Sequence, residues 1–169
     1  MVSEVFRFIQ NRELPNCYLT GGALYQTIWN SQLQRDNHQE IQDYDIFFYD
    51  AEKLSEECEK SIETEIHNEF GLVGDVKNQA RVHLWYEKKF GIKISPLKSS
   101  EEGISRFPVE CTCVGISTLD SKIFSPFGLQ DIYKGILKRN KLSAASSAQF
   151  SKKIQSYKSR WPHLKIYSE

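Results

Sequence analysis

The chain has 169 residues, which is the usual length of one domain and enough to bury a single hydrophobic core without disulfides or a structural metal. We therefore expect one domain over residues 1–169. Its 22 basic and 22 acidic side chains leave no net charge, which excludes an overall field that draws the protein to nucleic acid or to an anionic membrane.

Apolar runs are short, and the cysteines are few. The longest runs, such as "IFFY", fall far short of the roughly 20 residues of a membrane helix. Glu4 and Arg7 interrupt the N-terminal apolar residues, which therefore lack the core of a signal peptide.

The four cysteines lack the C-x₂₋₄-C pairs of zinc sites. We expect reduced, partly buried thiols in a cytoplasmic protein, with Cys111 and Cys113 on one face of a strand.

Strand and helix patterns alternate through the first part of the chain. Apolar residues at mixed helical spacing follow Ser3, a possible N-cap. "DYDIFFYD" is a β-branched and aromatic run of the kind found in strands. The expected elements are helices at 3–12 and 23–33, strands at 17–20 and 43–50, and a loop at 34–42.

The rest of the chain continues the alternation. Apolar residues recur every four positions from Leu54 to Phe70, which predicts an amphipathic helix ended by Gly71. Segment 78–91 predicts a helix ended by Gly91, with a strand through "ARVHLWY" as the competing interpretation. The remaining expected elements are strands at 72–77 and 110–118, a helix opened by the capping box "SSEE" at 99–102, a turn at 125–128, and helices at 129–139 and 147–161. This order indicates an α/β or α+β fold around a small sheet.

Two glycines, Gly21 and Gly22, stand where the first strand meets the second helix. Glycine is costly in regular structure, so the pair indicates positive φ or a close approach of the backbone to another group. One such group is a phosphate, because amide N–H groups at a helix N-terminus form an anion site. The other interpretation is a tight turn that only requires glycine.

Carboxylates on the second and third strands indicate a metal site. Asp43 and Asp45 are two residues apart, so both side chains leave one face of a strand with Cα atoms about 6.5 Å apart. Without a cation they repel, whereas Mg²⁺ accepts a few carboxylates together with water and phosphates. Asp75 in "VGDVK" is available as a third acid, or as an ordinary turn residue. Asp50 has the opposite parity and is expected to end the strand or cap a helix.

Charge is uneven along the chain. Residues 50–69 hold eight acids against two lysines, and residues 134–169 hold nine bases against one acid. One interpretation is that two solvated helix faces of opposite sign stabilise each other. Alternatively, the basic segment faces a phosphate-bearing acceptor.

The combination of these motifs resembles the polymerase-beta-like nucleotidyltransferase superfamily. The motifs are "LTGGALYQTIWN" and "IQDYDIFFYD", followed by Asp75, and they are especially similar to the tRNA-nucleotidyltransferase form of the pattern. The whole chain also resembles a bacterial family of small stand-alone nucleotidyltransferase-like proteins of unassigned substrate, through "NQARVHLWYEKKFG", "EEGISRF", "CTCVGI", "SPFGLQDIY" and "YKSRWPHL". The resemblance implies an α+β fold with a small mixed sheet of the nucleotidyltransferase type, flanked by helices, with extra C-terminal helices.

The resemblance also implies an activity, which is the Mg²⁺-dependent transfer of a nucleoside monophosphate from an NTP to an unidentified hydroxyl acceptor. In that superfamily a Gly-Gly or Gly-Ser turn binds the triphosphate and three acids hold two metal ions. The implied catalytic and metal-binding residues are Asp43, Asp45 and Asp75 with two Mg²⁺ ions, and the implied nucleotide-binding residues are Gly21, Gly22, Thr20 and Arg81.

Other residues and functions are secondary candidates. Lys77 and His83 follow the third strand as weaker phosphate-binding candidates than Arg81. Trp29, Trp85 and Trp161, together with the aromatics of "IFFY", are expected in the core rather than as base-stacking platforms. The acceptor is a small molecule, a protein or RNA, and neither DNA nor a membrane is expected as a partner. A non-catalytic nucleotide-binding or protein-interaction module, and an RNA-binding role of the basic C-terminal segment, stay open as alternatives.

Overall fold

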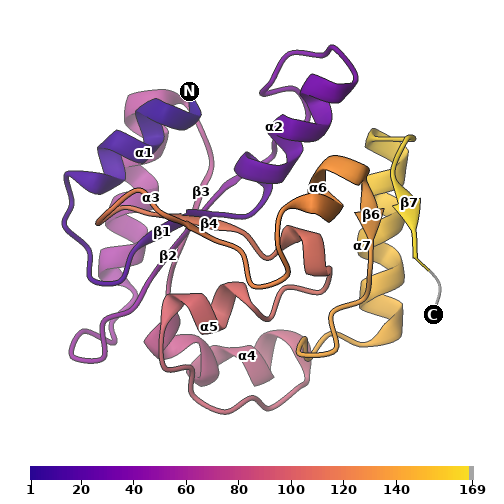
Figure 1. Cartoon of the computed structure of the whole chain (residues 1–169). Helices are drawn as coiled ribbons and strands as arrows, with labels where there is room; N and C mark the ends of the chain where they lie inside the picture. Colours follow the sequence, from indigo (N-terminus) through magenta and orange to yellow (C-terminus); the bar gives the residue numbers. More distant parts are fainter. Residues whose placement is uncertain (168–169) are drawn as a thin grey trace.

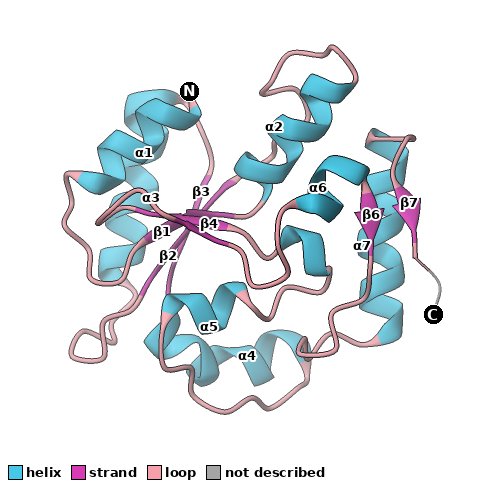
Figure 2. Cartoon of the chain, viewed as in Figure 1, coloured by secondary structure: helices cyan, strands magenta, loops and turns pink. Residues whose placement is uncertain are grey.

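A computed structural model describes residues 1–167 of the chain. Helices, strands and loops alternate along the described chain, as Figure 2 shows. The helices are α1 (Val2–Gln10), α2 (Gly22–Gln32), α3 (Glu57–Phe70), α4 (Val82–Phe90), α5 (Ser100–Ile104), α6 (Gln130–Lys134) and α7 (Ser147–Arg160), with 3₁₀ turns η1 (Gln79–Arg81) and η2 (Glu110–Thr112). The strands are β1 (Tyr18–Thr20), β2 (Tyr44–Phe48), β3 (Gly74–Asn78), β4 (Gly115–Ser117), β5 (Ile123–Phe124), β6 (Ile136–Leu137) and β7 (Lys165–Ile166).

The first five strands form a mixed sheet in the order β3-β2-β1-β4-β5. β2 and β3 are parallel and joined through α3, whereas the other neighbours are antiparallel. Alternate residues of β2 are fully buried and partly buried, so one face of the strand is sealed and the other is more open. This alternation decides where the acids of β2 point.

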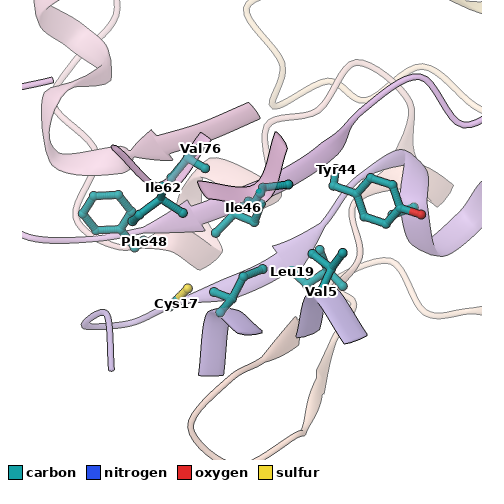
Figure 3. Packing of buried hydrophobic residues seen from close by; sticks show 11 residues of the cluster. Val5, Cys17, Leu19, Tyr44, Ile46, Phe48, Ile62 and Val76 are labelled. Atoms are coloured by element: carbon teal, nitrogen blue, oxygen red, sulfur yellow. The ribbon is translucent and has the colours of Figure 1, made fainter. Parts of the chain in front are cut away.

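Helices α1 and α3 cover the sealed face of the sheet, and α5 and α4 lie on the other side (Figure 1). Val5 of α1 and Ile62 of α3 pack against Leu19 of β1, Ile46 of β2 and Val76 of β3, and Figure 3 shows these side chains gathered between the elements. Ile46 of β2 is therefore held by side chains of the covering helices and of the neighbouring strands, and this packing anchors the strand that carries Asp45.

A second core joins the C-terminal elements to α2. Trp29 of α2 and Trp161, which follows α7, are both 0% exposed, and their ring centroids lie 5.4 Å apart. The Tyr25 hydroxyl lies 2.6 Å from that of Tyr157, again joining α2 to α7. Because α2 begins at Gly22, this core fixes the helix whose N-terminus adjoins β2.

Most expected elements are confirmed, with shifts at their ends. α1 begins after Met1 rather than after Ser3, and α3 begins at Glu57 instead of Leu54. Gly71 and Gly91 end their helices in the left-handed conformation, as expected. The helical interpretation of residues 78–91 is correct and the competing strand is wrong, because the segment forms η1 and α4.

Two expected elements are partly wrong. Residues 110–112 form a 3₁₀ turn, not a strand, since Thr112 bonds back to the Val109 carbonyl through both its backbone N–H and its hydroxyl. Cys111 therefore enters the second core, whereas Cys113 packs in a third, smaller cluster with Tyr18 and Ile104, and the two do not share one strand face. All four cysteines are free thiols.

The helix expected at 129–139 stops after Lys134. Gly135 takes a φ of 64°, and the chain then enters β6, which pairs with β7. Strands β5 and β7 were not expected, because two-residue strands carry no periodic signal of their own. Among residues 1–167, no helix has both the length and the apolar composition that crossing a membrane requires.

Asn78 joins the end of β3 to the loop after β2. It is 0% exposed, and its amide donates to the Asp50 and Lys53 carbonyls while its Oδ1 accepts from the Asp50 and Ala80 N–H groups. Because Asn78→Ala leaves these buried backbone groups without partners, we expect unfolding free energy to fall by about 2–4 kcal/mol, measured by urea denaturation. Asn68→Ala, at an exposed position of α3, is the control and is expected to change it by less than about 0.5 kcal/mol. Equal losses in both variants contradict this role.

Candidate active site

Gly21 of the glycine pair lies in close contact with Asp45. Gly21 takes φ 71° and ψ −147°, a conformation that essentially only glycine adopts. A Cβ added at Gly21 would lie only 1.8 Å from Asp45 Oδ2 and 2.9 Å from Asp45 Cβ, so that the acid would have to shift. The Gly22 N–H, at the start of α2, donates to the same oxygen over 3.4 Å. The glycine turn therefore brings the N-terminus of α2 directly onto a carboxylate of the D-x-D motif.

Asp45 and Asp75 are direct partners across the parallel strands β2 and β3. Cross-strand partners share a face of the sheet, and this face is the more open one. Asp43 immediately precedes β2 with the same parity as Asp45. The register therefore places Asp45 and Asp75 on one face, whereas Asp43 lies outside the paired residues and its place on that face stays a prediction.

The three carboxylates interact electrostatically. Burial, together with the charges of Asp43 and Asp75, raises the pKa of Asp45 to about 7 against the opposing effect of the Gly22 N–H. Burial also raises the pKa of Asp43, with a contribution from Asp75, while Lys153 and Arg160 of α7 oppose the rise. The acids therefore form a site that is stabilised by added positive charge.

Lys77 supplies part of that charge. Its Nζ lies 2.6 Å from Asp75 Oδ1 and 2.8 Å from Glu63 Oε1. Burial alone lowers the pKa of Lys77, but the hydrogen bonds to Asp75 and Glu63 outweigh it and raise the pKa. Within residues 1–167, no group of three or more His, Cys, Asp or Glu side chains is arranged to hold a metal ion. In this structure the partner of Asp75 is the Lys77 ammonium group.

A cleft of about 420 Å³ opens beside Asp45 and Asp75. Its walls come from α4, from α5 with the segment that follows it, and from residues 143–153. Asp43 precedes the strand and is not part of the lining. Four basic side chains line the cleft, namely Lys77, Lys89, Arg106 and Lys153. Such a cleft offers both carboxylates for cations and cations for an anionic ligand.

Two expected nucleotide-binding residues are engaged within the fold. Thr20 pairs with Asp45 across β1 and β2, but it is 0% exposed and its hydroxyl donates to the Val114 carbonyl over 2.6 Å. Arg81 pairs with Glu59 over 2.7 Å and donates to the Leu54 carbonyl, beside α3 and outside the cleft. Neither side chain lines the cleft, and neither is part of the site that we propose.

Other sequence assignments have mixed outcomes. Asp50 lies in the loop after β2, where its side chain accepts hydrogen bonds from the Glu52 and Lys53 N–H groups. These bonds confirm its structural role. Trp29 and Trp161 are core residues as expected, whereas Trp85 lines the cleft. His83 Nδ1 is buried without a hydrogen-bond partner among the described residues.

Sequence reasoning missed most of the basic lining. Lys89 carries no sequence signal for the cleft beyond its place in the last turn of α4, and Arg106 carries none because the acids of the cleft are distant from it in sequence. Lys153 belongs to the basic C-terminal segment, whose charge was the available signal. The acidic segment, in contrast, uses Glu59 and Glu63 of α3 to pair with Arg81 and Lys77.

A family model described as "Nucleotidyltransferase" matches residues 7–166. An NMR structure reported to reveal a CCA-adding enzyme head domain is similar with a TM-score of 0.76 and 21% identity, covering 99% of this chain and 89% of that one. A complex of a CCA-adding enzyme with ATP is similar with a TM-score of 0.52 and 14% identity, over 99% of this chain and 39% of that longer one. No curated protein sequence matches this chain significantly. The structural similarities establish the fold, which is the α+β nucleotidyltransferase head-domain fold expected from the sequence.

The close contact at Gly21 predicts that its substitution damages both stability and the site. Gly21→Ala combines a strained φ with a collision against Asp45, so we expect a loss of about 2–4 kcal/mol in unfolding free energy, measured by urea denaturation. Gly91→Ala also has a positive φ of 70°, but its ψ of 14° lies in the left-handed helical region that other residues can adopt, and a Cβ there meets no atom within 4 Å. We therefore expect it to lose only about 1 kcal/mol. Equal losses contradict a special requirement for glycine at position 21.

The raised pKa of Asp45 predicts a pH-dependent effect on stability without divalent cations. Between about pH 4 and 7 the folded state retains a proton that the unfolded chain has released, so this group lowers stability as pH rises to about 7. Asp45→Asn removes that loss. We expect the variant to be more stable than wild type at pH 8 by on the order of 1–3 kcal/mol, with little difference near pH 4, from urea midpoints.

Asp120→Asn is the control for this experiment. Its hydrogen bond from Lys122 lowers the pKa of Asp120 to about 2, so its stabilising effect is present above the usual pKa of aspartate and is lost as pH falls. We therefore expect Asp120→Asn to be less stable than wild type at pH 8. A gain for Asp45→Asn that is the same at both pH values contradicts the electrostatic cause.

Proposed function

Because the chain belongs to the nucleotidyltransferase family, we propose that it transfers a nucleoside monophosphate from an NTP to a hydroxyl acceptor. The observation that carries the proposal is the pairing of Asp45 with Asp75 across β2 and β3, in a cleft that basic side chains also line. Phosphoryl-type transfer depends mainly on positioning and charge stabilisation, and this cleft combines groups of both signs.

The donors at the site fit Mg²⁺. Asp43, Asp45 and Asp75 offer only carboxylate oxygens, and the mutual repulsion that raises the pKa of Asp45 favours a bound cation. Mg²⁺ uses one or two protein carboxylates with water and phosphate oxygens, so it does not require a complete protein cage. We propose that these three acids hold two Mg²⁺ ions, which when bound stabilise the triphosphate charge and lower the pKa of the acceptor hydroxyl.

The chain's own groups position the triphosphate. We propose that the Gly22 N–H, which donates to Asp45, and the neighbouring Gly21 N–H bind the β- and γ-phosphates, and that the dipole of α2 favours this binding. Lys153 and Arg106 line the same cleft and neutralise further negative charge. Asp75 accepts the proton of the acceptor hydroxyl once Lys77, its present partner, turns to a phosphate oxygen.

A second candidate function is nucleotide binding without transfer. The Lys77–Asp75 ion pair favours it, because an ammonium group that stays on Asp75 neutralises the third acid. Both functions require NTP binding in the cleft, so only a measurement of nucleotidyl transfer distinguishes them.

The test uses the whole chain with labelled NTPs, Mg²⁺ and a cell extract, and follows both the molecule that acquires label and the release of pyrophosphate. We expect Asp45→Asn and Asp75→Asn each to reduce transfer about 100-fold or more, because each removes a charged group that acts on the reacting phosphates. Asp120→Asn, an acid outside the cleft that pairs with Lys122, is expected to retain activity within about twofold.

The outcomes separate the candidates. Transfer that survives both Asp45→Asn and Asp75→Asn refutes the proposed site. Mg²⁺-dependent NTP binding without any labelled product supports the second candidate instead, and binding that also survives Asp43→Asn and Asp45→Asn counts against a metal role for these acids.

A further inference from the structure

The cleft that holds Asp45 and Asp75 also carries an aromatic surface from α4. Trp85, Tyr86 and Phe90 all line it. Their rings touch one another, with centroids 4.6 Å apart for Tyr86 and Phe90, 6.0 Å for Trp85 and Tyr86, and 6.4 Å for Trp85 and Phe90. We call these three residues the aromatic wall.

The aromatic wall is not part of a closed core. Trp85 and Tyr86 are partly buried, and Phe90 is 39% exposed. Trp29 and Trp161, in contrast, are 0% exposed and pack within the second core. Large aromatic side chains dominate hydrophobic cores, so rings that instead line a cavity offer free π-surface to a ligand.

Cationic side chains accompany the aromatic wall. Lys89 Nζ lies 5.4 Å from the centroid of the Trp85 ring and 5.3 Å from that of Phe90. Lys77, Arg106 and Lys153 line the same cleft. One cavity of about 420 Å³ thus joins an apolar aromatic surface to a strongly polar region of acids and bases.

We propose that the aromatic wall binds the base of the NTP by stacking, while the polar region holds its phosphates. A nucleoside triphosphate has an aromatic end and a polyanionic end, and the cleft presents a complementary surface for each. Stacking of a base on an aromatic side chain is sequence-tolerant because every base has a π-face. The inference rests on the proposed function, since it assigns the substrate's base to the cleft in which the phosphates are handled.

The experiment separates the two ends of the ligand. Binding of ATP and of inorganic tripolyphosphate is measured by calorimetry in the presence of Mg²⁺. We expect Trp85→Ala to weaken ATP binding about 5- to 100-fold and to leave tripolyphosphate binding unchanged within about twofold. Retained tripolyphosphate binding also shows that the variant is folded. Trp85→Phe keeps a π-face and is expected to recover most of the ATP affinity.

A matched control lies on the same helix. Leu84 is 59% exposed and outside the cleft, so Leu84→Ala is expected to leave both affinities unchanged. Tryptophan fluorescence gives a second readout. Because Trp29 and Trp161 are fully buried, we expect ATP to quench the wild-type signal through Trp85 and this response to vanish in Trp85→Phe.

The results distinguish failure of this inference from failure of the proposed function. Wild-type binding of both ligands, with ATP affinity unaffected by Trp85→Ala, overturns the base assignment and leaves the proposed function standing. Normal ATP binding by Trp85→Ala together with lost transfer also overturns it, because the aromatic wall then serves the acceptor. Failure of the wild type to bind either ligand overturns the proposed function and the inference with it.

Discussion

The parallel pairing of β2 with β3 is the constraint on which the site depends. It places Asp45 beside Asp75 on the open face of the sheet, while the sealed face of β2 packs on α1 and α3. Like charges at neighbouring strand positions destabilise a sheet, so the fold must offset their repulsion. It does so with the Gly22 N–H at Asp45 and with the Lys77 ammonium at Asp75. The stability that the hydrophobic cores provide is what allows this unfavourable arrangement to persist.

In the function that we propose, a bound nucleotide with its cations replaces the groups that offset this repulsion. A carboxylate with a pKa of about 7 is only half ionised near neutral pH, and a cation nearby favours its ionised form. The Gly22 N–H contact to Asp45 is long at 3.4 Å, which leaves the start of α2 weakly satisfied. The candidate site thus combines carboxylates with a weakly satisfied helix N-terminus, which suit added ions of opposite sign.

Local patterns predicted the centre of the site, and tertiary contacts decided the rest. The parity of Asp43 and Asp45 follows from strand geometry, and Gly21 marks a conformation that few residues adopt, so both could be read from short stretches. Thr20 and Arg81 could not, because their partners Val114 and Glu59 are distant in sequence. The same holds for the cleft, which takes its walls from segments up to residue 153. The turn at 110–112 escaped prediction since Thr112 favours a local bond to Val109 over strand pairing.

Lys153 belongs to α7, whereas the acids whose charge it opposes are Asp43, just before β2, and Asp45 within it. Helix α7 is held to α2 by the contact between the Tyr157 and Tyr25 hydroxyls, inside the second hydrophobic core. Packing of that core therefore also sets the charge balance of the cleft, so that an apolar interface formed by other residues bears on the electrostatics of the carboxylates.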